Sequence, residues 1–184
     1  MERRCIPPRD LVYCMIAASR KPVSEGTHVR ACYAGSFDPF TNGHLDILRD
    51  SCAIFEQVHV LIGVNAQKHR HYDAEEMASA IRRVLAREGL SNCVVRVYGG
   101  LTAKYCAEHR INYLVRGLRN SMDYSYEENI AEVNRLINPA LSSIYLRAKN
   151  AAISSSMVRE LFSYGEPVDA FVPPEISEVM RRQA

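Results

Sequence analysis

Hydrophobic and polar positions follow two alternating patterns from about residue 29 to the end of the chain. Short runs of apolar, often β-branched residues are typical of buried strands. Each run is followed by a stretch whose apolar residues recur roughly every three or four positions, as on one face of a helix. We predict strands at 29–33, 58–64, 93–98, 113–115 and 143–146. We predict helices at 44–55, 73–89, 102–110, 121–137, 154–164 and 174–182. Strands that alternate with helices form right-handed βαβ units. The expected fold class is therefore α/β, a single doubly wound domain with a five-stranded parallel sheet and additional C-terminal helices.

Length and composition fit one globular domain. A chain of 184 residues suffices for one sizeable α/β domain and is too short for two comfortable ones. Its net charge of +2 gives no case for bulk binding to nucleic acid or to a membrane, so neither partner is expected. The six cysteines form no Cys-x-x-Cys pair, which favours a reducing, cytoplasmic setting.

The first 28 residues differ from the rest of the chain. Residues 11–18 are mostly apolar, but Pro7 and Pro8 interrupt the approach to this run. The run is too short for a typical signal peptide and far too short to span a bilayer. We expect residues 1–28 to form a poorly ordered N-terminal extension and residues 29–184 to form the functional domain.

The most informative segment is the loop between the first predicted strand and the first predicted helix. Residues 33–44 read Tyr-Ala-Gly-Ser-Phe-Asp-Pro-Phe-Thr-Asn-Gly-His. Such a loop delivers the hydroxyl of Ser36 and the imidazole of His44 to a helix N-terminus. There, free amides and the helix dipole favour an anion such as a phosphate. Thr41 and Asn42 would equally serve as N-caps of an ordinary turn, and a short glycine motif alone would favour that interpretation.

Further groups that can bind phosphate follow other predicted strands. Arg116 and Arg119 come after the fourth strand, and two guanidinium groups can grip phosphates with paired donors. Residues 154–156 are three serines that open a helix, where hydroxyls and free amides could hold a second anion. A surface ion pair and a serine N-cap are the ordinary alternatives. Because the carboxyl ends of parallel strands share one edge of the sheet, we expect these groups to converge there.

The string from Gly35 to His44 resembles the signature of the HxGH nucleotidylyltransferase superfamily. Thr-Asn-Gly-His at residues 41–44 is similar to the Thr-x-Gly-His form carried by the phosphopantetheine adenylyltransferases. Val-Arg-Gly-Leu-Arg at 115–119 and Ile-Ser-Ser-Ser at 153–156 fit the same branch, and the resemblance runs from Val29 to the C-terminus. It implies a Rossmann-like fold and a reaction in which ATP and 4′-phosphopantetheine give dephospho-CoA and pyrophosphate. The adenylyl group would pass by direct in-line attack, with no covalent enzyme intermediate.

The resemblance also implies roles for individual residues. His44 would be catalytic and would donate to the α-phosphate as negative charge builds there. The residues implied for the acceptor are Ser36, Lys68, Thr102 and Arg116. The residues implied for ATP are Ser36, Phe37, His44, Gly117, Leu118, Arg119, Glu127, Asn150, Ala151, Ala152, Ile153, Ser154, Ser155 and Ser156. Mg²⁺ is the expected cofactor, held mostly by ATP and not by protein ligands. A homohexamer is the assembly that the resemblance implies.

Several positions depart from the usual pattern of that branch. Ser36 stands where Thr is usual and keeps the hydroxyl, and Ala34 replaces a Pro. Arg70 and His71 stand where Pro and Met are more common. An aromatic residue that the branch often has near position 150 is missing.

Two other functions remain open from the sequence. A nicotinamide mononucleotide adenylyltransferase or a cytidylyltransferase would share the chemistry, but these enzymes usually show His at the position of Thr41 and a different string at 153–156. A non-catalytic nucleotide sensor would keep the fold and lose turnover. The loss of His44, Lys68 or Arg119 would favour the sensor, and all three are present.

Overall fold

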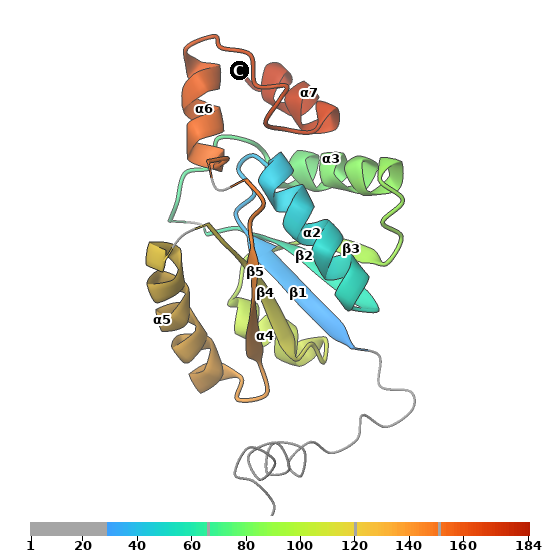
Figure 1. Cartoon of the computed structure of the whole chain (residues 1–184), viewed down its shortest axis with the longest axis vertical. Helices are drawn as coiled ribbons and strands as arrows, with labels where there is room; N and C mark the ends of the chain where they lie inside the picture. The colour runs from blue at the N-terminus through green and yellow to red at the C-terminus, as the bar shows by residue number, and fades with distance from the viewer. Residues whose placement is uncertain (1–28, 66, 120, 151) are drawn as a thin grey trace, which may run out of the picture.

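The structure, a computed structural model, is a parallel sheet of five strands in the order β3-β2-β1-β4-β5 (Figure 1). It describes residues 29–65, 67–119, 121–150 and 152–184. The strands are β1 (Arg30–Gly35), β2 (Gln57–Gly63), β3 (Cys93–Tyr98), β4 (Tyr113–Leu118) and β5 (Ser142–Arg147). The helices are α2 (Asn42–Ile54), α3 (Ala74–Arg87), α4 (Thr102–Glu108), α5 (Ser121–Ile137), α6 (Ser155–Ser163) and α7 (Pro174–Arg182). The extension expected at 1–28 lies outside the described residues, so this domain boundary stays a prediction.

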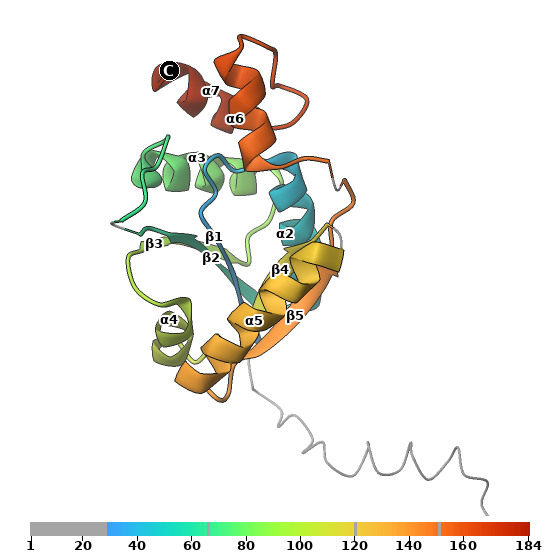
Figure 2. The same ribbon diagram turned by 90° about the vertical axis from the view of Figure 1, so that its left-hand side faces the viewer.

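Helices cover both faces of the sheet. Helices α2 and α3 lie on one face, and α4 and α5 lie on the other (Figure 2). Helices α6 and α7 stand beyond one end of the sheet, at the top of Figure 1, where α7 packs on α3. No helix among the described residues is long and apolar enough to cross a bilayer.

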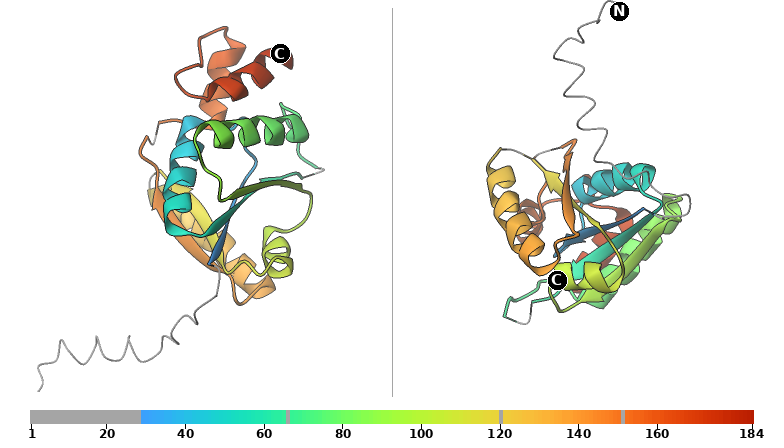
Figure 3. Two further views of the ribbon diagram at one scale, coloured as in Figure 1. Left: turned by 90° about the vertical axis from the view of Figure 1, so that its right-hand side faces the viewer. Right: turned by 90° about the horizontal axis from the view of Figure 1, so that it is seen from below.

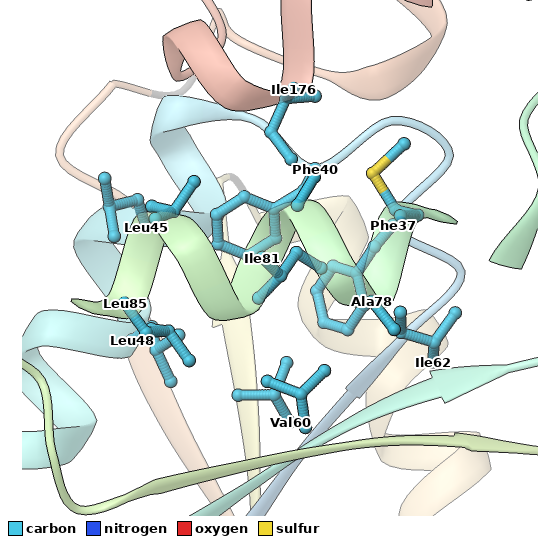
Figure 4. Close-up of a cluster of buried hydrophobic side chains, with 14 of the residues drawn as sticks. Phe37, Phe40, Leu45, Leu48, Val60, Ile62, Ala78, Ile81, Leu85 and Ile176 are labelled. Carbon is cyan, nitrogen blue, oxygen red and sulfur yellow. The ribbon is translucent and has the colours of Figure 1, made fainter. Parts of the chain in front are cut away.

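Two-sided burial explains why the strands read as continuous apolar runs. Successive side chains of β1 alternate between the two cores, with Tyr33 in the larger and Cys32 in the smaller. In the larger core, Phe40 from the loop after β1 lies with Ile81 of α3 and Ile176 of α7 (Figure 4). This anchoring makes the loop after β1 part of the core, which fixes the backbone that carries the predicted site.

The central strands separate at the edge where that loop begins. β1 and β4 pair only as far as Tyr33↔Val115. Beyond this point β1 continues alongside β2, and β4 continues alongside β5. Because the chain winds in opposite directions from β1 and β4, a crevice opens between their carboxyl ends, where ligands bind in open α/β sheets.

Most element boundaries differ from the predicted ones by one or two residues, and two differences bear on the site. β4 extends to Leu118 where we predicted an end at Val115, so Arg116 lies inside the strand and not after it. The pairing of β4 with β5 continues to Leu118↔Arg147, and this tertiary contact overrides the weak strand propensity of a segment with Arg and Gly. Helix α2 begins at Asn42, two residues before the predicted start at His44.

Candidate active site

A cavity of about 320 Å³ occupies the crevice between β1 and β4. It is lined by the ends of both strands, the loop after β1, the first turn of α2, one residue of α5 and the segment that leads into α6. The lining residues are Tyr33, Ala34, Gly35, Ser36, Phe37, Thr41, Gly43, His44, Ile47, Arg116, Gly117, Arg119, Glu127, Ala148, Asn150, Ile153, Ser154, Ser155 and Ser156. The structure therefore brings together the loop motif, the arginine string and the serine string, as we expected from the common edge of the sheet.

His44 is held in place by a capping box at the start of α2. Thr41 is the N-cap, and its hydroxyl accepts from the backbone N–H of His44 at 3.4 Å. In return, the backbone N–H of Thr41 donates to Nδ1 of His44 at 3.0 Å. Because Nδ1 accepts this bond, it carries no proton, and the proton of the neutral ring is on Nε2. Nε2 has no partner among the described residues, so it can donate to a ligand in the cavity.

The surroundings of His44 keep the ring neutral. Phe37 packs edge-on against it with centroids 5.1 Å apart, and Phe40 lies 5.6 Å away. Burial, together with the positive charges of Arg119 and Arg116, lowers the pKa of His44 to about 4. At neutral pH the ring is therefore a hydrogen-bond donor at Nε2 and not a cation.

The Thr41 hydroxyl should matter through the orientation of His44. Thr41→Val keeps the shape of the side chain but removes the oxygen that lies 3.0 Å from Nδ1. For the reaction that the resemblance implies, we expect kcat to fall about 3- to 10-fold, the value of one hydrogen bond, with KM nearly unchanged. Steady-state kinetics of Thr41→Val beside Thr41→Ser, which keeps the hydroxyl, measure this effect. Equal activity of the two variants would contradict the orienting role.

Arg116 is fixed from two sides and still has donors to spare. Its Nε and Nη2 donate to the two carboxylate oxygens of Glu127 at 2.6 and 2.5 Å. Its Nη1 donates to the carbonyl of Ala34 at 2.7 Å. A guanidinium has five N–H groups, so two remain for a ligand. The two hydrogen bonds to the Glu127 carboxylate thus hold the Arg116 guanidinium in one orientation at the cavity.

Arg119 lies at the outer part of the cavity. Its guanidinium donates to both carboxylate oxygens of Asp123, from Nε at 2.9 Å and from Nη2 at 3.2 Å. The side chain is 41% exposed, so this i,i+4 pair lies in contact with water and adds little to stability. Arg119 therefore remains available to an anionic ligand that enters the cavity.

The serine string supplies backbone amides more than hydroxyls. Ser154 is the N-cap of α6 and accepts from the N–H of Met157 at 3.1 Å. The Ser155 hydroxyl donates to the carbonyl of Pro39 at 2.8 Å, and the Ser156 hydroxyl accepts from Arg159. Helix geometry leaves the N–H groups of Ser155 and Ser156 without an intrahelical partner. These amides, at the positive end of the helix dipole, are the groups that face an anion.

Sequence analysis missed Asp38 as the residue that organises the loop after β1. Its buried carboxylate accepts from the backbone N–H of Tyr72 at 3.0 Å and of His71 at 3.1 Å. Arg159 of α6 donates to the Asp38 carbonyl, and Arg70 donates to the carbonyl of Ser36 at 2.8 Å. Asp38 thereby joins the segment after β2 to the site. Only the place of Asp38 within the motif could have indicated this organising role, because each of its hydrogen-bond partners is more than thirty residues away in the sequence.

Some predicted residues lie outside the cavity. Lys68 is exposed on the segment after β2, and Thr102 begins α4; neither lines the cavity. Leu118 faces a neighbouring hollow that Tyr145 and residues 146–147 also line. Ala152 is exposed and does not line the cavity, and Ala151 lies outside the described residues.

Known proteins resemble this chain over most of its length. The family model of cytidylyltransferase-like proteins matches residues 32–161. A phosphopantetheine adenylyltransferase of Cytophaga hutchinsonii is 38% identical over 148 residues, which cover 79% of this chain and 97% of that protein. A solved structure from Vibrio parahaemolyticus, assigned as a nicotinate-nucleotide adenylyltransferase, superposes with a TM-score of 0.62 at 16% identity. The superposed part covers 83% of this chain and 91% of the Vibrio parahaemolyticus chain. At 16% identity the likeness shows the fold alone.

The chain belongs to the cytidylyltransferase-like family and is a nucleotidyltransferase. Within this family it belongs with the phosphopantetheine adenylyltransferases. The predicted family and the predicted α/β fold with its parallel sheet are thus confirmed.

Proposed function

We propose that the chain transfers the adenylyl group of ATP to 4′-phosphopantetheine, giving dephospho-CoA and pyrophosphate, in the cavity between β1 and β4. One observation carries the proposal: His44 is neutral, held at Nδ1 and left to donate at Nε2, beside two arginines and the amides of α6. The relative from Cytophaga hutchinsonii, which matches along nearly its whole length, supports the choice of substrates.

The proposed reaction is a single displacement at the α-phosphorus of ATP. A phosphate oxygen of the acceptor forms the new bond while the bond to the oxygen that bridges the α- and β-phosphates breaks, and pyrophosphate leaves. His44 donates from Nε2 to the α-phosphate oxygens as their negative charge grows. The described lining of the cavity offers donors and cations and no activated nucleophile, so positioning and charge neutralisation account for the catalysis.

Each anionic group has a candidate partner in this scheme. Arg116, at the inner end, would hold the phosphate of 4′-phosphopantetheine with its two remaining N–H groups. Arg119 and the amides of Ser155 and Ser156 would hold the triphosphate and the departing pyrophosphate. Lys68, which is exposed on the segment tied to Asp38 and does not line the cavity, is the further cation proposed for the acceptor.

Magnesium enters this proposal as part of the substrate, as the Mg²⁺ complex of ATP. Among the described lining residues the only carboxylate is that of Glu127, and Arg116 occupies both of its oxygens. No group of three or more potential ligands occurs among the described residues. The described part of the chain thus offers no preformed cage, and the triphosphate would supply the ion's ligands.

The reverse reaction tests function and mechanism together. With dephospho-CoA and pyrophosphate, the protein should form ATP, which luciferase detects. Without 4′-phosphopantetheine or dephospho-CoA, labelled pyrophosphate should not exchange into ATP, because no adenylyl-enzyme forms. Exchange in the absence of the acceptor would contradict the single displacement. Failure to form ATP would contradict the choice of substrates.

A homohexamer is the assembly that we propose, supported by an apolar stripe on α5. The stripe consists of Tyr126, Val133, Leu136 and Ile137, which lie within about a third of a turn of one another on the helix. Leu136 is 84% exposed and Tyr126 is 66% exposed. Large apolar side chains exposed along one helix face mark an interaction surface, and a second copy of the chain is the occupant proposed here.

Leu136→Glu should therefore disrupt the assembly. A buried, unpaired carboxylate in an apolar interface is strongly unfavourable, so the molar mass by light scattering should fall toward that of a smaller species. Arg135→Gln changes the charge equally at the adjacent position, on the other side of the helix, and should leave the mass unchanged. The same mass for Leu136→Glu and the wild type would exclude this face as the interface.

A reducing compartment, such as the cytoplasm, is also part of the proposal. The four cysteines of the described part of the chain are all free, and Cys52 and Cys93 lie with sulfur atoms 3.0 Å apart without a bond. Thiols persist in this state where the surroundings are reducing.

A further inference from the structure

A second hollow lies at the opposite edge of the sheet from the cavity described above. It is lined by the first residues of β1, β2 and β3 and by the end of α4, and its volume is about 510 Å³. The right-hand view in Figure 3 looks at the molecule from below, toward this end of the sheet. The charged lining residues are Arg30, Arg96, Arg110 and Glu108, and His59 and His109 also line it.

The three arginines have no carboxylate partner in the part of the chain that the structure describes. Among the described residues, no carboxylate oxygen lies within 4.0 Å of the guanidinium of Arg30, Arg96 or Arg110. Most other arginines of the described part do lie in ion pairs, as Arg49 does with Glu88. Three guanidinium groups around one hollow, of which Arg30 and Arg96 donate only to backbone carbonyls, therefore depart from the pattern of this surface. Their planar forks suit phosphate oxygens.

The floor of the hollow is rigid and polar. The His59 side chain is buried, with Nε2 3.2 Å from Oε1 of Gln57 and Nδ1 2.9 Å from the hydroxyl of Tyr105. Both bonds are satisfied by a neutral ring, with Nε2–H donating to Gln57 and the Tyr105 hydroxyl donating to Nδ1. The His109 ring stacks on Tyr105 with centroids 4.0 Å apart, and its Nδ1–H donates to the Tyr105 carbonyl at 2.9 Å. Arg30 donates to the carbonyl of His109 at 3.3 Å.

The charges around the floor of the hollow also favour an anion. Burial, together with the charges of His109, Arg30 and Arg96, lowers the pKa of His59 to about 4. Positive charge thus accumulates here in a chain whose net charge is only +2, with the carboxylate of Glu108 as the one opposing charge among the described lining residues. A bound anion would neutralise this field.

We propose that this hollow, lined by Arg30, Arg96 and Arg110, is a second anion site that binds the phosphate group of a small phosphorylated molecule. A small ligand fits better than a nucleic acid, because the cations surround one compact hollow and do not form a stripe at the spacing of a phosphate backbone. The site lies away from the β1–β4 crevice and does not depend on the reaction proposed there.

Calorimetric titration with pyrophosphate at constant ionic strength tests the site. The wild type should bind pyrophosphate at two places per chain, the crevice and the hollow. Arg96→Gln/Arg110→Gln should lose one of these events or weaken it at least ~10-fold, since each arginine can supply charge-assisted bonds. Turnover of ATP should be retained. Arg83→Gln/Arg181→Gln removes the same charge from other exposed positions and should titrate like the wild type.

The source of the phosphate is distinguished by repeating the titration with inorganic phosphate and with ADP. A preference for ADP at the hollow would identify a nucleotide, and equal affinity per phosphate would identify the free anion. The proposal would be overturned if Arg96→Gln/Arg110→Gln bound pyrophosphate at two places with wild-type affinity. It would also be overturned if the control Arg83→Gln/Arg181→Gln lost the same binding event. Much tighter binding of a long oligonucleotide, abolished by the same pair of substitutions, would replace the small ligand by a nucleic acid and also overturn it.

Discussion

His44→Ala should lower kcat by about 10²- to 10³-fold and leave the Kd for ATP nearly unchanged. The loss corresponds to removal of one preorganised donor to an oxyanion in a shielded site. In the structure Nδ1 of His44 accepts from the N–H of Thr41, so only Nε2 can donate to the α-phosphate. The ring is also neutral, so its removal takes away a transition-state hydrogen bond and not a charge that attracts ATP. Single-turnover kinetics and equilibrium binding of ATP measure the two quantities separately.

His44→Gln is the matched control for this prediction. A glutamine side chain can accept from the Thr41 amide with its oxygen and still offer N–H donors to the cavity. It should recover part of the lost kcat, while His44→Ala should not. A large loss of ATP affinity in His44→Ala, with kcat preserved, would show that His44 acts in ground-state binding and would contradict the mechanism.

Arg116→Ala should raise the KM for 4′-phosphopantetheine by about 10- to 100-fold and change the KM for ATP far less. Two N–H groups of Arg116 remain for a ligand, and charge-assisted hydrogen bonds of this kind are worth about 1.5–3 kcal/mol. The substitution also leaves the Glu127 carboxylate, of which only 11% is exposed, without its counterion. The KM values for each substrate, with the other at saturation, measure the effect.

Arg116→Ala removes donors to the acceptor and also leaves Glu127 without its counterion; Glu127→Gln separates these two consequences. This variant keeps the positive charge of Arg116 but weakens the two-point hold that orients it. We expect a smaller rise in the acceptor KM than in Arg116→Ala, and thermal unfolding shows whether either variant is destabilised. An Arg116→Ala variant that folds and keeps the wild-type KM for the acceptor would exclude the proposed role of Arg116.

The sequence predicted the elements, and the edge of the sheet at which the motifs of the candidate site meet, because both follow from local patterns. Each strand was a short apolar run, and the site followed from motifs at the carboxyl ends of strands that had to share one edge. Thr41 and Asn42 were recognised as capping candidates, and the structure has Thr41 as the N-cap.

The sequence could not predict contacts that the tertiary fold creates. The pairing of β4 with β5 turned Arg116 into a strand residue, and the Arg116–Glu127 fork joins a strand to the helix that follows it. Asp38 and Arg159 are brought together by the packing of α6 over the loop after β1, at a separation of 121 residues. From the pattern alone, Arg159 was only one more polar position on a helix.

The measurement that tests the central claim most directly is release of pyrophosphate from Mg²⁺-ATP. 4′-Phosphopantetheine, nicotinamide mononucleotide and nicotinate mononucleotide are offered as acceptors one at a time to the wild type and to His44→Ala. The account predicts rapid turnover by the wild type with 4′-phosphopantetheine only, and a loss of about 10²-fold or more in His44→Ala. Turnover with a mononucleotide alone would contradict the assigned acceptor. Binding of ATP without release of pyrophosphate, whichever acceptor is present, would contradict catalysis at this site.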